Sequence, residues 1–210
     1  MSEGDRTRCH ADHMTASEKR MVLVTINYLE MKSPDRRSAA PGWPERAVVR
    51  RAERPTLSFY RYLYNTVGAD WEWYERRRLG NDALAAIVHD DAVEVNVLYV
   101  RGVPAGFVEL DRRIEDEVEI AYFGLIPEYV GRGFGPALLG WALERAWSFT
   151  PRRVWLHTCS LDHPKALAVY LRAGFEAYDR EVVSVQLELR EPAGRGGRGE
   201  DMQNRSRPQP

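Results

Sequence analysis

The hydrophobic and polar positions along the chain alternate with a period of two in several segments. This alternation, with many β-branched and aromatic residues, is typical of strands. The strands predicted in this way cover residues 21–31, 46–52, 92–100, 103–111, 118–126, 152–159 and 181–189. Arg101 and Gly102 form a tight turn between two of them and predict a hairpin. The segment 118–126 is the most apolar, which predicts a central place in the sheet.

Other segments repeat their apolar residues every three or four positions, as one face of a helix does. The predicted helices cover residues 56–67, 70–79, 82–89, 136–147 and 163–174. Pro55 suits the first turn of the first helix, because the N–H group that it lacks would have no partner there. Asp70 is a candidate N-cap of the second helix, and Gly68 and Gly174 are candidate helix ends.

Together these elements predict one α/β domain over residues 21–190. Residues 1–20 are polar, and residues 191–210 are rich in glycine, proline and arginine. Both segments are therefore expected to be disordered tails. A length of 210 residues with 44% hydrophobic residues suits a single full-sized core.

Composition and charge argue against a membrane-spanning, secreted or nucleic-acid-binding protein. The sequence has no run of 18 apolar residues, and its polar start lacks the apolar stretch of a secretory signal. A formal net charge of -1 argues against nucleic acid as a partner. Cys9 and Cys159 cannot form a disulfide framework, which fits a reducing compartment. We expect a cytoplasmic protein that binds neither membranes nor nucleic acid.

A glycine-rich loop, PEYVGRGFG at residues 127–135, lies between a predicted strand and a predicted helix. The first N–H groups of a helix lack partners and its dipole favours an anion, so this is a candidate phosphate site. Gly131, Gly133 and Gly135 would let a ligand approach the backbone, and Arg132 could add a charged contact.

Nucleotide-binding motifs of two kinds are excluded at this loop. A Walker P-loop needs Gly-Lys-Ser/Thr, and the chain has Gly135-Pro136-Ala137. A dinucleotide fingerprint needs a glycine where Pro136 stands. The pyrophosphate of another nucleotide cofactor and a turn without a ligand both stay open.

Three segments resemble the GNAT superfamily of acetyl-CoA-dependent N-acetyltransferases. The family signature is Q/R-x-x-G-x-G/A, where this chain has residues 130–135, VGRGFG, with valine at the first position. The family's later helix has N-x-x-A, a tyrosine and a Gly-Phe ending. The chain has His163-Pro164-Lys165-Ala166, then Tyr170, then Gly174-Phe175. Residues 48–63 resemble the family's first strand and helix, so the resemblance covers about residues 46–189.

The resemblance implies a mixed, mostly antiparallel central sheet flanked by helices. The strand at 21–31 would be an additional N-terminal strand at the edge of this sheet. It also implies acetyl transfer from acetyl-CoA to a primary amine by direct attack. A catalytically silent acyl-CoA-binding or protein-interaction module on the same fold is the alternative. The implied cofactor-binding residues are Phe123, Gly124, Leu125, Gly131, Arg132, Gly133, Phe134, Gly135 and His163.

Amine acetylation needs a base and an acid. A protonated amine, with a pKa of about 10, cannot attack a carbonyl, and the departing thiolate benefits from a proton donor. The resemblance implies Tyr170 as the acid, with a core aromatic as the alternative. Glu119 is the candidate base, and Glu109 is held in reserve. Strand alternation would place Glu119 on one face with Phe123; a solvated strand start is the alternative for Glu119.

The resemblance also implies that the first two predicted helices and their connection form the acceptor site. Tyr64, Trp71 and Trp73 are its candidate residues, and Glu72 and Glu75 could attract a cationic amine. Core packing is the alternative for about half of these aromatic residues. A small amine, an amino acid and a peptide amine all fit, as do a monomer and a homodimer.

A possible nucleophile and a possible metal site are both expected to have no role in function. Cys159 is expected to be a buried structural cysteine. Cys9, His10 and His13 lack further spaced ligands, so no metal site is expected.

Overall fold

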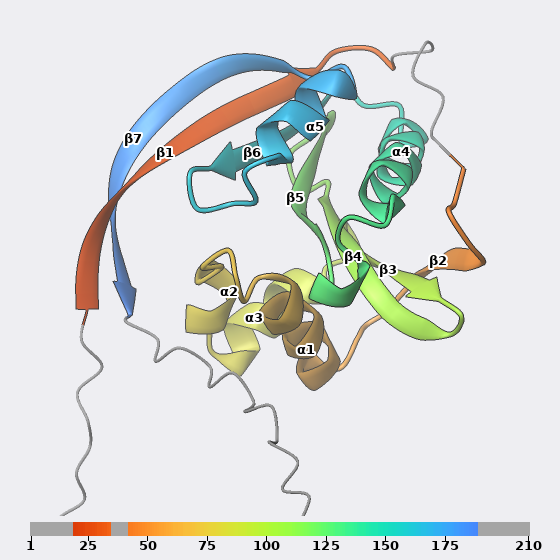
Figure 1. Cartoon of the computed structure of the whole chain (residues 1–210), viewed down its shortest axis with the longest axis horizontal. Helices are drawn as coiled ribbons and strands as arrows, with labels where there is room; N and C mark the ends of the chain where they lie inside the picture. The colour runs from red at the N-terminus through yellow and green to blue at the C-terminus, as the bar shows by residue number, and fades with distance from the viewer. Residues whose placement is uncertain (1–18, 35–41, 189–210) are drawn as a thin grey trace, which may run out of the picture. The chain divides into compact units, whose positions relative to one another are not determined.

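The computed structural model describes residues 19–34 and 42–188 (Figure 1). Residues 22–185 form one compact unit. A second unit, residues 1–21 and 186–210, is described at 19–21 and 186–188. Residues 19 and 20, expected at the end of the N-terminal tail, belong to strand β1. The rest of the predicted tails and the candidates Cys9, His10 and His13 lie outside the described residues.

Seven strands form one sheet in the order β2-β3-β4-β5-β6-β1-β7. Their bounds are β1 Lys19–Met31, β2 Ala47–Arg51, β3 Val93–Val100, β4 Val103–Asp111, β5 Glu117–Leu125, β6 Arg153–Cys159 and β7 Glu176–Glu188. The pairs β2·β3, β3·β4, β4·β5 and β1·β6 are antiparallel, and β5·β6 is parallel. The predicted mixed, mostly antiparallel sheet is confirmed, and β5 holds the predicted central place.

The additional strand β1 is present, but its expected place at the edge of the sheet is wrong. It lies between β6 and β7, with Ile26 opposite Cys159 and Met31 opposite Val154. Leu29 and Met31 are buried in the core. An inner position gives such a strand hydrogen-bond partners on both sides and covers its apolar side chains.

The helices agree with the sequence in number but not in all their bounds. They are α1 Leu57–Val67, α2 Glu75–Arg78, α3 Asn81–Val88, α4 Phe134–Trp147 and α5 Ala166–Arg172, with a 3-10 turn η1 at Pro127–Tyr129. Thr56, and not Pro55, immediately precedes the first helix; its hydroxyl accepts a hydrogen bond from the Phe59 N–H. The last helix begins three residues later than predicted and is followed by Gly174 at φ 98°.

The helix predicted over residues 70–79 is wrong for its first half. Glu72 has φ 52°, which a right-handed helix does not allow. Trp73 folds back onto Gly68, where a Cβ would lie 2.5 Å from the Trp73 Cβ. The large side chains of this turn therefore pack inward, and the helix begins only at Glu75.

Each face of the sheet carries its own hydrophobic core. One core joins α4 and α5 to the sheet through residues such as Leu138 and Tyr170. The other joins α1 and α3 through residues such as Tyr60 and Leu84. We call these sides the α4–α5 face and the α1–α3 face.

A β-bulge in β5 changes which side chains share a face. Glu109 pairs with Tyr122 and Leu110 pairs with Ile120, so Ala121 is an extra residue. Ile120 and Phe123 both pack on the α4–α5 face. Glu119 is on the other face, so its expected place on one face with Phe123 is wrong.

Candidate active site

The central strands β5 and β6 separate at the middle of the sheet. Their register covers Glu117–Glu119 and Arg153–Trp155 and ends there. Beyond this point β5 stays paired with β4, and β6 with β1. One side of β5 past Ile120 is therefore open to a ligand.

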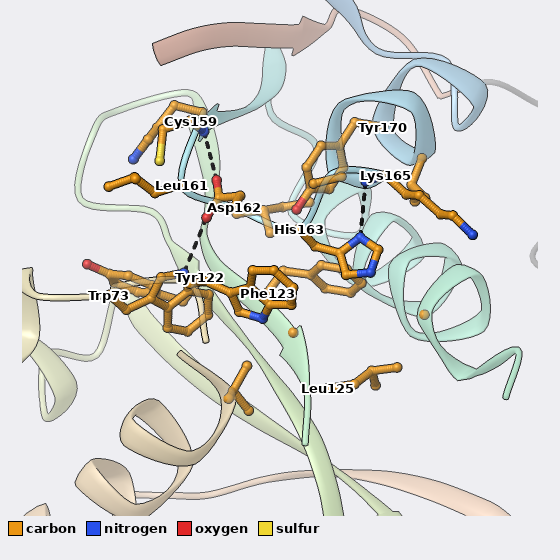
Figure 2. A pocket seen from close by; sticks show the side chains of 18 of the residues that line it. Trp73, Tyr122, Phe123, Leu125, Cys159, Leu161, Asp162, His163, Lys165 and Tyr170 are labelled. Atoms are coloured by element: carbon orange, nitrogen blue, oxygen red, sulfur yellow. Dashed lines mark hydrogen bonds between the residues drawn. The ribbon is translucent and has the colours of Figure 1, made fainter. Parts of the chain in front are cut away.

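A cavity of about 530 Å³ lies at this opening and is lined from both faces of the sheet. From α4, α5 and their preceding loops come Val130, Gly131, Gly133, Gly135, Pro136, Lys165, Ala166, Val169 and Tyr170. From the other side come Val67, Trp71, Glu72, Trp73, Tyr74, Glu75 and Tyr122. Figure 2 shows Tyr170 and His163 across the cavity from Trp73 and Tyr122.

The glycine-rich loop forms the α4 end of this cavity. Gly131 and Gly133 have φ of 79° and 87°, which L side chains rarely adopt. Gly133 precedes α4, and no side chain caps the first N–H groups of that helix. A Cβ at Gly133 would also lie 3.1 Å from the ring of Pro44. The loop thus keeps its backbone accessible, as a phosphate cradle requires.

Three of the predicted cofactor-binding residues lie on β5, next to the opening. Phe123, Gly124 and Leu125 all line the cavity. A Cβ at Gly124 would lie 2.3 Å from Val67, so β5 can pass this close to α1 only with glycine there. The backbone of the strand is thus brought to the cavity.

Two other predicted cofactor residues have side chains outside the cavity lining. The guanidinium of Arg132 pairs with Glu45 and lies over the ring of Tyr129. The side chain of Phe134 is fully buried in the α4–α5 core, so only its backbone could meet a ligand. Their cofactor contacts stay predictions.

Tyr170 brings a hydroxyl group to the cavity from α5. Its side chain is 8% exposed, and its ring packs against Phe123 and Phe175. The hydroxyl has no hydrogen-bond partner among the described residues. Burial, and then the charge of Asp162, raises the pKa of Tyr170 above its ordinary value, so the hydroxyl keeps its proton.

The segment between β6 and α5 is held by Asp162. Its carboxylate accepts a hydrogen bond from the Thr158 hydroxyl at 2.8 Å. It also accepts hydrogen bonds from the Cys159 N–H at 2.7 Å and from the Trp73 indole N–H at 3.4 Å (Figure 2). His163 follows, and its Nδ1 accepts a hydrogen bond from the Lys165 N–H. Asp162 therefore joins the α5 loop to the α1–α2 connection.

The candidate base Glu119 does not line the cavity. Its carboxylate lies 3.4 Å from Nδ1 of His157, which does line it. The reserve candidate, Glu109, is fully buried and accepts hydrogen bonds from the Tyr60 hydroxyl and from Arg76. Glu109 is thus engaged in the core, away from the cavity lining.

Of the three predicted acceptor residues, two line the cavity and one does not. Trp71 and Trp73 line the cavity, and the ring of Trp71 lies 5.0 Å from that of His163. Tyr64 is 1% exposed and packs behind Trp73 at 5.2 Å. Its hydroxyl accepts a hydrogen bond from the Arg76 N–H. Tyr64 can therefore support the cavity wall without forming its surface.

Cys159 lines the cavity, where burial raises the pKa of its thiol to about 11. A thiol that keeps its proton is a poor nucleophile, which fits its predicted structural role.

Several cavity residues were missed by the sequence analysis, namely Val24, Ile26, Tyr122, His157 and Asp162. A polar residue after an apolar strand could have pointed to Asp162. The others depend on strand neighbours and on the bulge at Ala121, which no local pattern specifies.

Two further properties of the described residues bear on function. They contain no group of three or more His, Cys, Asp or Glu placed to hold a metal ion. Within the same residues, no helix is both long enough and apolar enough to cross a membrane. The expected cytoplasmic location stays a prediction.

Comparisons with solved structures identify the fold. A GCN5-related N-acetyltransferase from Sphaerobacter thermophilus aligns over 80% of this chain and 53% of its own, with 20% identity and a TM-score of 0.54. A second, from Kribbella flavida, aligns over 80% and 59%, with 17% identity and a TM-score of 0.51. This chain therefore spans less than two thirds of either relative.

The ribosomal-protein-S18-alanine N-acetyltransferase of Escherichia coli aligns over 70% of this chain and 98% of its own. Its identity is 15% and its TM-score 0.53, and at such identities the likeness shows the fold alone. No curated protein matches the sequence significantly. The model of the acetyltransferase (GNAT) family matches residues 56–175, which include the loop at α4, the divergent strands and Tyr170. The chain belongs to the GNAT family of acetyltransferases.

Proposed function

We propose that the protein is an N-acetyltransferase that moves an acetyl group from acetyl-CoA to a primary amine by direct attack. The cavity between β5 and β6 carries this proposal. It joins an uncapped, glycine-rich helix N-terminus to a tyrosine hydroxyl that has no partner within the described chain.

The residues present fit a coenzyme A donor. Gly131, Gly133 and the first turn of α4 offer N–H groups to a pyrophosphate, in a loop whose positive φ angles and close contact with Pro44 favour glycine. The open side of Gly124 and Leu125 offers backbone groups to an amide-bearing arm. When bound, acetyl-CoA supplies an acetyl thioester that an uncharged amine can attack.

Tyr170 is the proposed acid in this reaction. Its hydroxyl keeps its proton because burial and a nearby carboxylate raise its pKa. It can therefore donate that proton to the departing sulfur. We assign the removal of the amine proton to the part of the cavity where the side chain of Glu119 contacts that of His157.

The acceptor enters, in this proposal, from the side of Trp71 and Trp73. Glu72 and Glu75 line the same part of the cavity and favour a cationic amine. Small amines, amino acids and peptide amines are all candidates. The E. coli relative is a ribosomal-protein-S18-alanine N-acetyltransferase, so a peptide with an N-terminal alanine belongs among them.

Two measurements test the proposal. Acetyl-CoA should raise the melting temperature, and a panel of amines should include at least one that releases free thiol from it. Acetate alone should leave the melting temperature unchanged. A protein that binds acetyl-CoA but releases thiol with no amine would be a silent acyl-CoA-binding module, and the proposed activity would be wrong.

A further inference from the structure

His157 is a titratable side chain of the cavity for which the sequence assigned no role. It lies on β6, on the α1–α3 face, and its side chain is 36% exposed. Its Nδ1 faces the carboxylate of Glu119 at 3.4 Å. Its Nε2 makes no hydrogen bond to any described residue. One ring nitrogen is thus directed by a carboxylate, and the other is free.

Two carboxylates of the cavity lining already accept hydrogen bonds. Asp162 already accepts three hydrogen bonds, and Glu75 accepts one from Tyr122 at 2.6 Å. The thiol of Cys159 keeps its own proton. Glu119 does not line the cavity, and its carboxylate lies against Nδ1 of His157, which does.

We propose that His157 is the catalytic base and that Glu119 is a positioning residue that acts through it. This proposal rests on the proposed acetyltransferase function. A carboxylate at Nδ1 holds the proton of a neutral imidazole there and leaves Nε2 as the acceptor. Glu119 also stabilises the imidazolium that forms.

In the proposed reaction the ammonium group gives up two protons, one to His157 and one to Tyr170. His157 Nε2 takes one proton from the ammonium group and passes it to water. The amine nitrogen forms a bond to the acetyl carbon, and the carbon–sulfur bond breaks. Tyr170 protonates the sulfur and regains a proton from the same nitrogen. The products are an amide, a thiol and one released proton.

The surroundings of His157 set the pH at which it can act. The contact with Glu119 raises its pKa, burial opposes this, and the charges of Glu119, Glu75 and Asp162 raise it further. From β1, the ring of Tyr28 lies 6.0 Å away, and its hydroxyl donates to Glu181 on β7. The net pKa is above the ordinary 6.5. Since the neutral ring is the base, activity should rise with pH through this raised value.

The test compares pH profiles of kcat/KM for wild type, His157→Gln and Glu119→Gln with an amine that releases thiol. We expect His157→Gln to lower kcat by about 10²–10⁴-fold and to remove the acidic limb, with acetyl-CoA affinity unchanged. Glu119→Gln should keep most of its activity and move the limb to lower pH, because the raising charge is gone. Imidazole added to His157→Ala should restore part of the rate.

Glu117→Gln is the matched control. It removes a carboxylate from the same strand as Glu119. The carboxylate of Glu117 pairs with Arg152 and Arg153 and does not line the cavity, so the acidic limb of the pH profile should stay in place. If His157→Gln keeps both its rate and its limb in an active enzyme, the assignment is wrong. If Glu119→Gln alone loses the limb and most of the rate, Glu119 is the base itself. A wild type that releases no thiol overturns the proposed function instead.

A second inference comes from the side chains of the additional strand β1. Since Leu29 and Met31 face α4 and α5, the alternate residues Val24 and Ile26 face the other side. Both line the cavity, as does Val185 of β7. Ile26 is opposite Cys159, two residues after His157 on β6. The strand thus adds an apolar wall beside the proposed base.

We infer that the acceptor is a primary amine carried on an apolar body. Trp71 and Trp73 provide a second apolar wall, while Glu72 and Glu75 suit its ammonium group. This inference also rests on the proposed function. A multiply charged amine would have to lose its hydration against Val24 and Ile26, which is costly.

The test compares 2-phenylethylamine with 1,2-diaminoethane as acceptors. We expect kcat/KM to be at least tenfold higher for the aromatic amine. Ile26→Asp should raise its KM about tenfold and leave acetyl-CoA affinity unchanged. Leu23→Asp, on the same strand but 74% exposed, is the control and should change neither value. Equal or better use of the diamine would overturn the inference, even in an active enzyme.

Discussion

The two halves of β5 have opposite surroundings. In the first half, Glu119 pairs with both β4 and β6, and the carboxylate of Glu117 is paired with Arg152 and Arg153. In the second half, Phe123 and Gly124 are paired with β4 and open to the cavity, with the unpartnered Tyr170 hydroxyl beside them among the described residues. Polar groups that are already paired stabilise the sheet. Those left without a partner are the ones available to a ligand.

Tyr170→Phe tests the open half most strongly. It keeps the ring and removes the proton that the side chain can donate. We expect turnover to fall by about 10²–10⁴-fold, with the melting temperature and acetyl-CoA affinity nearly unchanged. Tyr99→Phe, on β3 and outside the cavity lining, should leave turnover unchanged. Unchanged turnover in Tyr170→Phe would mean that the residue is a core aromatic.

Gly133→Val tests the phosphate end of the cavity, at the loop before α4. The side chain would meet Pro44 and would be strained at φ 87°. We expect the Kd for acetyl-CoA to rise by about 10–100-fold, because backbone hydrogen bonds to a charged group are lost. Isothermal titration measures it.

Gly102→Val is the matched control, since Gly102 has φ 88° in the β3–β4 turn and does not line the cavity. It should carry the same backbone strain without a change in Kd. If Gly133→Val binds acetyl-CoA as well as wild type does, the loop at α4 is not the phosphate site.

Glu117→Gln tests the closed half and should have the smallest effect. The hydrogen bonds from Arg153 lower the pKa of Glu117, against the effect of burial. A lowered pKa stabilises the fold above the ordinary value of 4.5, and this stability is lost as pH falls through the lowered value. We expect the variant to lose about 1–2 kcal/mol of unfolding free energy at pH 7.

Denaturant titrations at several pH values check this, and the difference from wild type should shrink below pH 4. Glu115→Gln removes an exposed carboxylate two residues earlier and should cost little at any pH. Equal losses in both variants would mean that the ion pairs of β5 contribute nothing specific.

The sequence predicts the elements and the family better than it predicts the site. Period-two alternation identifies the strands, and Gly131, Gly133 and Tyr170 identify the loop and the helix that meet at the cavity. Alternation fails at β5 because the extra residue Ala121 is visible only in the pairing with β4. The pairing of Glu119 with His157 depends on β6 lying parallel to β5, which joins residues 38 positions apart in the chain.

The position of β1 also has a consequence for how the protein folds. Thr25 and Ser160 bond to each other although 135 residues separate them. During synthesis β1 leaves the ribosome long before β6 is made, so its apolar residues stay exposed until β6 can pair with it. Contacts of such long sequence separation slow folding and expose an unpaired strand to aggregation. Attaching β1 to the chain after β6 by circular permutation should therefore speed refolding.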